Sequence, residues 1–165
     1  MNAPLIVSVN GVAAGAGASI ALCCDIVVAC ESASFIQAFS KIGLIPDSGG
    51  TFFLPRLIGI QKAAGLMMTA DPVSAKDAES MGMIYKVFSN DSFEQESLKL
   101  ASKIAQMPTK ALGLTKRLLN ASYYNNLEDQ LNLEEKCQTI AGDSADFKEG
   151  IEAFFEKRKP NFKGR

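Results

Sequence analysis

Residues 11–50 read GVAAGAGASIALCCDIVVACESASFIQAFSKIGLIPDSGG. This stretch opens with small residues directly after the apolar run Leu5–Val9, and it closes with the turn sequence Ile45–Thr51 (IPDSGGT). Small residues let backbone N–H groups approach a ligand closely. Asp47 is the only acid in the apolar, glycine-rich segment Ile42–Phe53. Backbone N–H groups can stabilise an oxyanion, and a single acid can transfer a proton. The stretch therefore predicts a proton-transfer site, provided that the fold brings its two ends together.

Composition limits the class of protein. The 165 residues suffice for one domain with a real core, and 47% apolar with 21% charged residues is ordinary globular material. A formal net charge of -1 argues against nucleic acid or an anionic membrane surface as partner. No apolar run is long enough to span a bilayer, and Met1–Pro4 does not resemble a secretory signal.

Cysteine and histidine usage narrows the chemistry. The four cysteines have no paired metal spacing, so we expect them to be reduced core residues of a cytoplasmic protein. The chain has no histidine. This excludes Ser-His-Asp and Cys-His catalysis within the chain and argues against a zinc site, so no metal is predicted.

The sequence pattern predicts an α/β part followed by helices, with a boundary at Pro108. Expected strands are 5–9, 26–29 and 84–88, with a short extended piece at 35–39. Expected helices are 18–24, 48–57 (bent or ended by Pro55), 61–69, one starting at Ser74, 92–106, 109–120, 127–141 and 145–157.

Three constellations could carry chemistry, and each has a structural alternative. Gly15-Ala16-Gly17 before a helix fits an oxyanion site, a nucleotide-phosphate turn or a tight turn without function. Asp47 fits either a general base or a helix N-cap. The basic end of the last helix, around Lys157, fits either contact with an anionic ligand or a solvated helix terminus.

Several motifs in register make the chain closely similar to the enoyl-CoA hydratase/isomerase (crotonase) superfamily, from about Pro4 to Lys163. These motifs are Gly11–Gly17 (GVAAGAG), Cys24–Val27 (CDIV), Gly43–Thr51 (GLIPDSGGT), Leu54–Arg56 (LPR) with Gly59, and Ala153–Pro160 (AFFEKRKP). The resemblance implies the α/β fold class: part of a crotonase (ClpP-like) spiral core in residues 1–108, with a helical oligomerisation tail in residues 109–165.

The resemblance also indicates a subgroup. Hydratases of the family hold a water with two glutamates, and here Ser19 and Phe39 stand at those positions. Asp47 stands where the family's double-bond isomerases carry their acid. The segment Ala38–Asp47 looks most like the family's ring-epoxide isomerases, which act on an epoxyphenylacetyl-CoA.

The resemblance implies a role for each site residue. Asp47 and the Ala16 N–H would be catalytic, and Gly15, Gly17, Phe39, Phe154 and Lys157 would bind substrate. The substrate would be an acyl-CoA thioester, with coenzyme A entering only as part of it and no other cofactor. A homotrimer or a dimer of trimers is expected, without nucleic acid or membrane partners.

The family's chains carry a further N-terminal part that holds the second oxyanion donor. We therefore expect this chain to be a fragment or a truncated product with little activity of its own. The alternatives to an isomerase are an enoyl-CoA hydratase and a catalytically inactive structural or assembly module.

Overall fold

The computed structural model describes residues 3–165 and divides the chain into two units. Residues 5–99 form one unit, and residues 100–165 with Ala3 and Pro4 form the other. The division falls inside helix α5 (Phe93–Ala105), earlier than the expected boundary at Pro108. Along residues 3–165, no helix combines the length and apolar character that crossing a membrane requires.

The first unit is a spiral in which successive turns of the chain add a strand to each of two small sheets. One sheet has the order β1 (Ile6–Val9), β3 (Ile26–Cys30), β6 (Lys86–Phe88), all parallel. The other has the order β2 (Val12–Ala14), β4 (Ser34–Ile36), β5 (Val73–Ser74), with β5 antiparallel to β4. The register pairs Ile6 with Ile26 and Val12 with Ser34.

The central strand β3 explains why this arrangement forms. Its sequence IVVAC is apolar throughout and buried from Val27 to Cys30, as expected for a strand covered on both faces of a parallel sheet. Phe35 of β4 and Leu54 of α2 are the largest fully buried apolar side chains of the unit. The spiral therefore closes around one apolar core.

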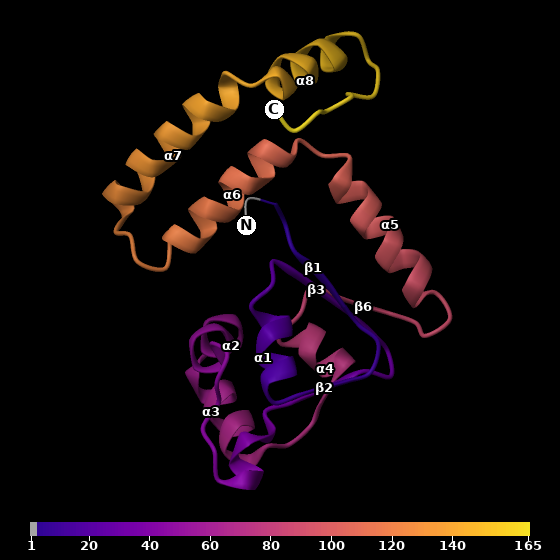
Figure 1. Cartoon of the computed structure of the whole chain (residues 1–165), viewed down its shortest axis with the longest axis vertical. Helices are drawn as coiled ribbons and strands as arrows, with labels where there is room; N and C mark the ends of the chain where they lie inside the picture. Colours follow the sequence, from indigo (N-terminus) through magenta and orange to yellow (C-terminus); the bar gives the residue numbers. More distant parts are fainter. Residues whose placement is uncertain (1–2) are drawn as a thin grey trace. The chain divides into compact units, whose positions relative to one another are not determined.

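Short helices connect the strands of this unit (Figure 1). They are α1 (Ala16–Leu22), the 3-10 helix η1 (Ala38–Ile42), α2 (Gly50–Ile58), α3 (Ile60–Thr69) and α4 (Ala75–Ser80). Ser74 caps α4, as the sequence predicts, by accepting a 3.1 Å bond from the Asp77 N–H.

The second unit is helical and contains α6 (Thr109–Ala121), α7 (Leu127–Gly142) and α8 (Ala145–Phe155). Asn126 caps α7 by accepting a 2.9 Å bond from the Asp129 N–H, and Ser144 caps α8 in the same way. These three helices agree with the ranges expected from the sequence.

Several local predictions were wrong. Extended structure ends at Ile36, so Phe39 lies in η1 and not in a strand. The first helix starts at Ala16 and not at Ala18, and α2 starts at Gly50 and continues past Pro55 to Ile58. The strands β2 and β5 were missed because two or three residues are too few for an alternating pattern to be visible.

Candidate active site

The junction between β2 and α1 has a backbone that favours glycine. Gly15 has φ 53° and ψ -125°, and its N–H donates a 2.8 Å bond to the Ile36 carbonyl. A Cβ on Gly15 would lie 3.8 Å from the Phe39 ring, so the structure brings these two predicted site residues together. A side chain at position 15 would be strained by the positive φ.

Ala16 begins the helix that follows. The first amides of a helix have no carbonyl one turn earlier to bind, so they are available to a ligand. Ala16 is half-buried, and a Cβ on the exposed Gly17 would meet nothing within 4 Å. The Ala16 N–H can thus serve as a hydrogen-bond donor for an oxyanion, and this role stays a prediction.

Asp47 begins a tight turn. The Gly50 N–H donates a 2.9 Å bond to the Asp47 carbonyl, and the two central residues have positive φ: Ser48 at 51° and Gly49 at 79°. Positive φ at both central positions defines a type I′ turn. This turn places the Asp47 side chain on the surface of the unit, where it is exposed.

The N-cap alternative for Asp47 was wrong. The residue that precedes α2 is Gly49, in a left-handed conformation, and no side chain caps this helix. Within residues 3–165 the Asp47 carboxylate has no hydrogen-bond or ion-pair partner. Local structure therefore makes no use of this carboxylate.

Ser19 and Phe39 stand at the positions where the family resemblance implies that hydratases carry glutamates. Both are buried, at 0% and 7% exposure. Ser19 lies against Gly50, the last residue of the Asp47 turn, since a Cβ on Gly50 would come within 2.6 Å of its Oγ. The helix that starts at Ala16 therefore also supports the turn that carries Asp47.

The surroundings of Asp47 differ from the enclosed apolar pocket that would favour a strong base. Its apolar neighbours Ile42, Leu44 and Ile45 are exposed, as is Asp47 itself. An apolar groove of about 480 Å3 adjoins the turn. Residues lining it include Leu44, Ile45, Pro46, Ile60, Met67 and Met68.

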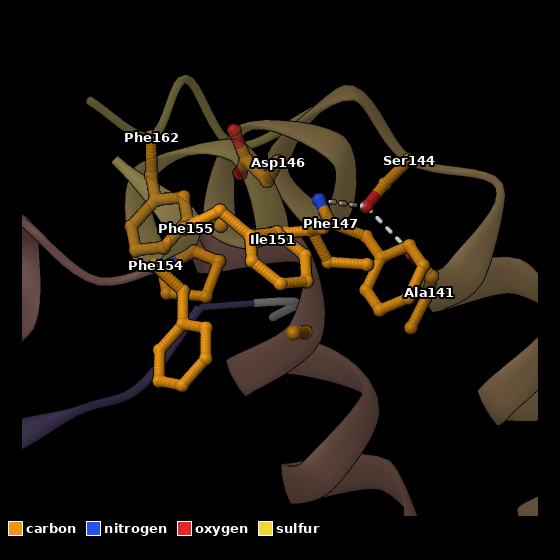
Figure 2. Close-up of a pocket in the computed structure, with 11 residues that line it drawn as sticks. Ala141, Ser144, Asp146, Phe147, Ile151, Phe154, Phe155 and Phe162 are labelled. Atoms are coloured by element: carbon orange, nitrogen blue, oxygen red, sulfur yellow. Dashed lines mark hydrogen bonds between the residues drawn. The ribbon is translucent and has the colours of Figure 1, made fainter. Parts of the chain in front are cut away.

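Phe154 and Lys157 lie in the helical unit, at the end of α8. Phe154 is 79% exposed and borders an apolar cavity of about 570 Å3, together with Phe147, Ile151 and Phe162 (Figure 2). Lys157 is exposed and has φ 55°. Its N–H donates to the Phe154 carbonyl, and the Arg158 N–H donates to the Ala153 carbonyl, which is the Schellman pattern of helix termination.

An ion pair fixes the segment after α8. Arg158 contacts both carboxylate oxygens of Glu149, at 2.6 and 3.0 Å, and the Asn161 N–H donates a 2.7 Å bond to the same carboxylate. The hydrogen bond from Arg158, followed by that from Asn161, lowers the pKa of Glu149 to about 2. The mutual hydrogen bond raises the pKa of Arg158.

Sequence reasoning missed two features near the site. Gln37 is buried beside η1, and neither polar atom of its side chain has a partner within residues 3–165. The contact between Ser19 and Gly50 was also missed. Nothing in the sequence indicates either one, because both arise from packing between segments distant along the chain.

Comparisons with known proteins show the family to which the chain belongs. The family model described as enoyl-CoA hydratase/isomerase matches residues 1–165. The chain is 48% identical over 162 residues to 1,2-epoxyphenylacetyl-CoA isomerase of Escherichia coli K12, covering 98% of this chain and 62% of that protein. It is 39% identical over 164 residues to 2,3-dehydroadipyl-CoA hydratase of the same organism, covering 99% and 64%.

Solved structures show the same fold. Enoyl-CoA hydratase from Bacillus anthracis matches with a TM-score of 0.94 and 34% identity, over 98% of this chain and 63% of that one. The enoyl-CoA hydratase from Polaromonas sp. JS666 matches with a TM-score of 0.92 and 36% identity, over 97% and 62%. The α/β crotonase fold predicted from the sequence is confirmed, and the chain spans less than two thirds of each of these relatives. It belongs to the enoyl-CoA hydratase/isomerase family.

Proposed function

We propose that the protein is an enoyl-CoA isomerase that moves a double bond, or rearranges a ring epoxide, in an acyl-CoA thioester. The observation that carries the proposal is the pairing of one exposed, unpartnered carboxylate at Asp47 with the absence of a carboxylate at Ser19 and Phe39. Asp47 offers a base for proton transfer. Positions 19 and 39 offer no carboxylate that would hold and activate a nucleophilic water.

The proposed reaction is a proton transfer along the acyl chain. Asp47 takes a proton from the carbon α to the thioester of a 3-enoyl-CoA, and the electron pair of the broken C–H bond delocalises onto the thioester oxygen as a dienolate. The Ala16 N–H donates to that oxygen, and losing one such donor typically costs about 3 kcal/mol of transition-state stabilisation. Asp47 then returns the proton two carbons further along, which leaves a 2-enoyl-CoA with no change in composition.

The substrate class follows from the same residues. The apolar groove beside the Asp47 turn offers room for a hydrocarbon acyl group, and Phe154 and Lys157 are proposed to contact the acyl-CoA held by a neighbouring subunit of a trimer. Coenzyme A enters as part of the substrate, and the proposed chemistry needs no metal or redox cofactor. Relatives named as isomerase and as hydratase are similar to this chain, at 48% and 44% identity, so the choice of an isomerase rests on Asp47, Ser19 and Phe39.

The base is tested by Asp47→Asn in the full-length protein. We expect isomerase kcat to fall at least about a hundredfold, because a general base contributes two to four orders of magnitude. The thermal midpoint should hardly change, since the carboxylate has no partner within residues 3–165. Asp91→Asn is the matched control at another exposed aspartate. Full activity of Asp47→Asn would refute the proposed base.

The reaction type is tested by comparing two substrates. Double-bond migration of a 3-enoyl-CoA, followed by absorbance of the conjugated thioester, should far exceed hydration of crotonyl-CoA. Comparable hydration would identify a hydratase. No turnover of either substrate by the full-length protein would favour the structural or assembly module.

A further inference from the structure

The contact between α1 and α2 is made by a small side chain against a residue with none. Ser19 is fully buried in α1, and Gly50 is the buried first residue of α2. A Cβ on Gly50 would lie 2.6 Å from Ser19 Oγ, closer than side chains tolerate, but 3.5 Å from Ser19 Cβ and 3.5 Å from Pro46 Cβ, which are ordinary contacts. The Ser19 hydroxyl therefore fills the space that a side chain at position 50 would need.

The glycine at position 50 is required for space and not for backbone conformation. Gly50 is helical, and it is not among the residues with positive φ in the described part of the chain. An alanine there would suit the helix better, because alanine has the higher helix propensity. Only the Ser19 hydroxyl opposes it.

Gly50 is also the residue that closes the Asp47 turn, through its N–H bond to the Asp47 carbonyl. A shift of Gly50 away from α1 would thus move the turn and the carboxylate with it. We propose that Ser19 is a positioning residue, whose contact with Gly50 determines where Asp47 is presented relative to the Ala16 N–H at the start of the same helix. This inference rests on the proposed function of Asp47.

The Ser19 hydroxyl acts here through its volume. Its oxygen is buried and has no hydrogen-bond partner within residues 3–165. Ser19→Ala replaces the hydroxyl by a hydrogen atom and loses no hydrogen bond, because the buried hydroxyl has no partner in the described residues. The thermal midpoint of this variant should therefore be equal or higher. The variant also removes the atom that would clash with a Cβ at position 50.

The test is a double-mutant cycle in the full-length protein, with kcat, KM and the thermal midpoint measured for each variant. Gly50→Ala should lower the isomerase kcat about a hundredfold, because a displacement of about 1 Å at a catalytic group has that effect. KM should change little, since the substrate-binding residues are intact. The double variant Ser19→Ala/Gly50→Ala should regain at least tenfold in kcat and exceed Gly50→Ala in thermal midpoint.

Gly65→Ala is the matched control, because Gly65 lies within α3 and a Cβ there would meet nothing within 4 Å. It should leave kcat unchanged. Recovery of the thermal midpoint without recovery of kcat would overturn the positioning role, as would wild-type kcat in Gly50→Ala. Failure of the proposed function is seen separately, because Asp47→Asn would then keep full turnover. That result would also remove the catalytic part of this inference. The non-additive change in thermal midpoint between Ser19→Ala and Gly50→Ala would still show whether the two residues are in contact.

Discussion

At the scale of single residues, the Asp47 turn stores strain at one position that is not a glycine. Ser48 has φ 51°, a conformation that costs a residue with a side chain about 1–2 kcal/mol. Its neighbour Gly49 has φ 79° without that cost. The strain lies directly beside the proposed base, as is common at functional sites.

Ser48→Gly should therefore stabilise the protein by about 0.5–1 kcal/mol, which is the relieved strain less the greater entropy of glycine in the unfolded chain. Urea unfolding measures this difference. Gly49→Ala is the control with the opposite expected effect on stability. A Cβ at this position of positive φ would also lie 3.0 Å from the Phe53 ring. It should destabilise the protein, and a destabilised Ser48→Gly would contradict the turn geometry.

The sequence singled out Asp47 as the candidate base, a role that stays a prediction, but it could not exclude the capping role. The distinction depends on the backbone conformation of Ser48 and Gly49, which makes Gly49 the residue before the helix. Ser19 could be recognised only as a missing glutamate. Its contact with Gly50 joins two segments that are far apart along the chain. A pattern of neighbouring residues cannot predict such a contact.

At the scale of elements, prediction from the sequence succeeded where periodicity extends over several turns. The helices α6, α7 and α8 have apolar residues at helical spacing, α6 begins after Pro108, and α7 and α8 begin at the capping residues Asn126 and Ser144. All of these are local signals. The strands β2 and β5 have neither, because their pairing with β4 is formed between distant parts of the chain. Phe39 was assigned to a strand because an apolar run does not show where extended structure ends.

The segment that follows α8 should respond to acid through Glu149. The pKa of Glu149 is about 2 in the folded chain, below its ordinary value of 4.5, so the unfolded segment binds the proton more tightly. The stabilisation is therefore present above about pH 4.5 and is lost as the pH falls towards 2. Hydrogen exchange of the Asn161 amide should accelerate, relative to its intrinsic rate, over this range.

Glu149→Gln provides the control for this prediction. The glutamine cannot form the charged pair with Arg158, so the Asn161 amide should already exchange faster at neutral pH and should show no further loosening between pH 4.5 and 2. Unchanged protection of Asn161 in this variant would show that other contacts hold the segment.

At the scale of the whole molecule, the feature of the helical unit that bears on assembly is its set of exposed apolar side chains. Large apolar side chains exposed on it are Leu119, Leu127, Leu131, Phe147, Ile151, Phe154 and Phe155. Exposed apolar side chains favour association when they lie together in a patch. This set agrees with the oligomerisation tail expected from the sequence, which stays a prediction, as does the acyl-CoA contact of Phe154 and Lys157 across subunits.

Lys157 allows the structural and the binding interpretations to be separated, because they predict opposite effects. Lys157 is the left-handed residue of a Schellman motif, a position that favours glycine. Replacing it by glycine should therefore raise the free energy of unfolding by up to about 1 kcal/mol. As a contact to a substrate phosphate, it should not be replaceable without weaker binding. Lys157→Gly should therefore raise the thermal midpoint and, at low ionic strength, raise KM for CoA substrates about fivefold, which corresponds to an exposed ion pair of about 1 kcal/mol.

Turnover at saturation should stay nearly constant, and the KM difference should shrink as salt is added, since exposed charges are screened. Lys157→Gln removes the charge but keeps a side chain at positive φ, so it should raise KM without the gain in stability. Lys159→Gln, at an exposed neighbouring cation, controls for the general charge of the helix end. If Lys157→Gly raises the thermal midpoint and leaves KM unaltered at low salt, the lysine is only a solvated cation at the end of α8.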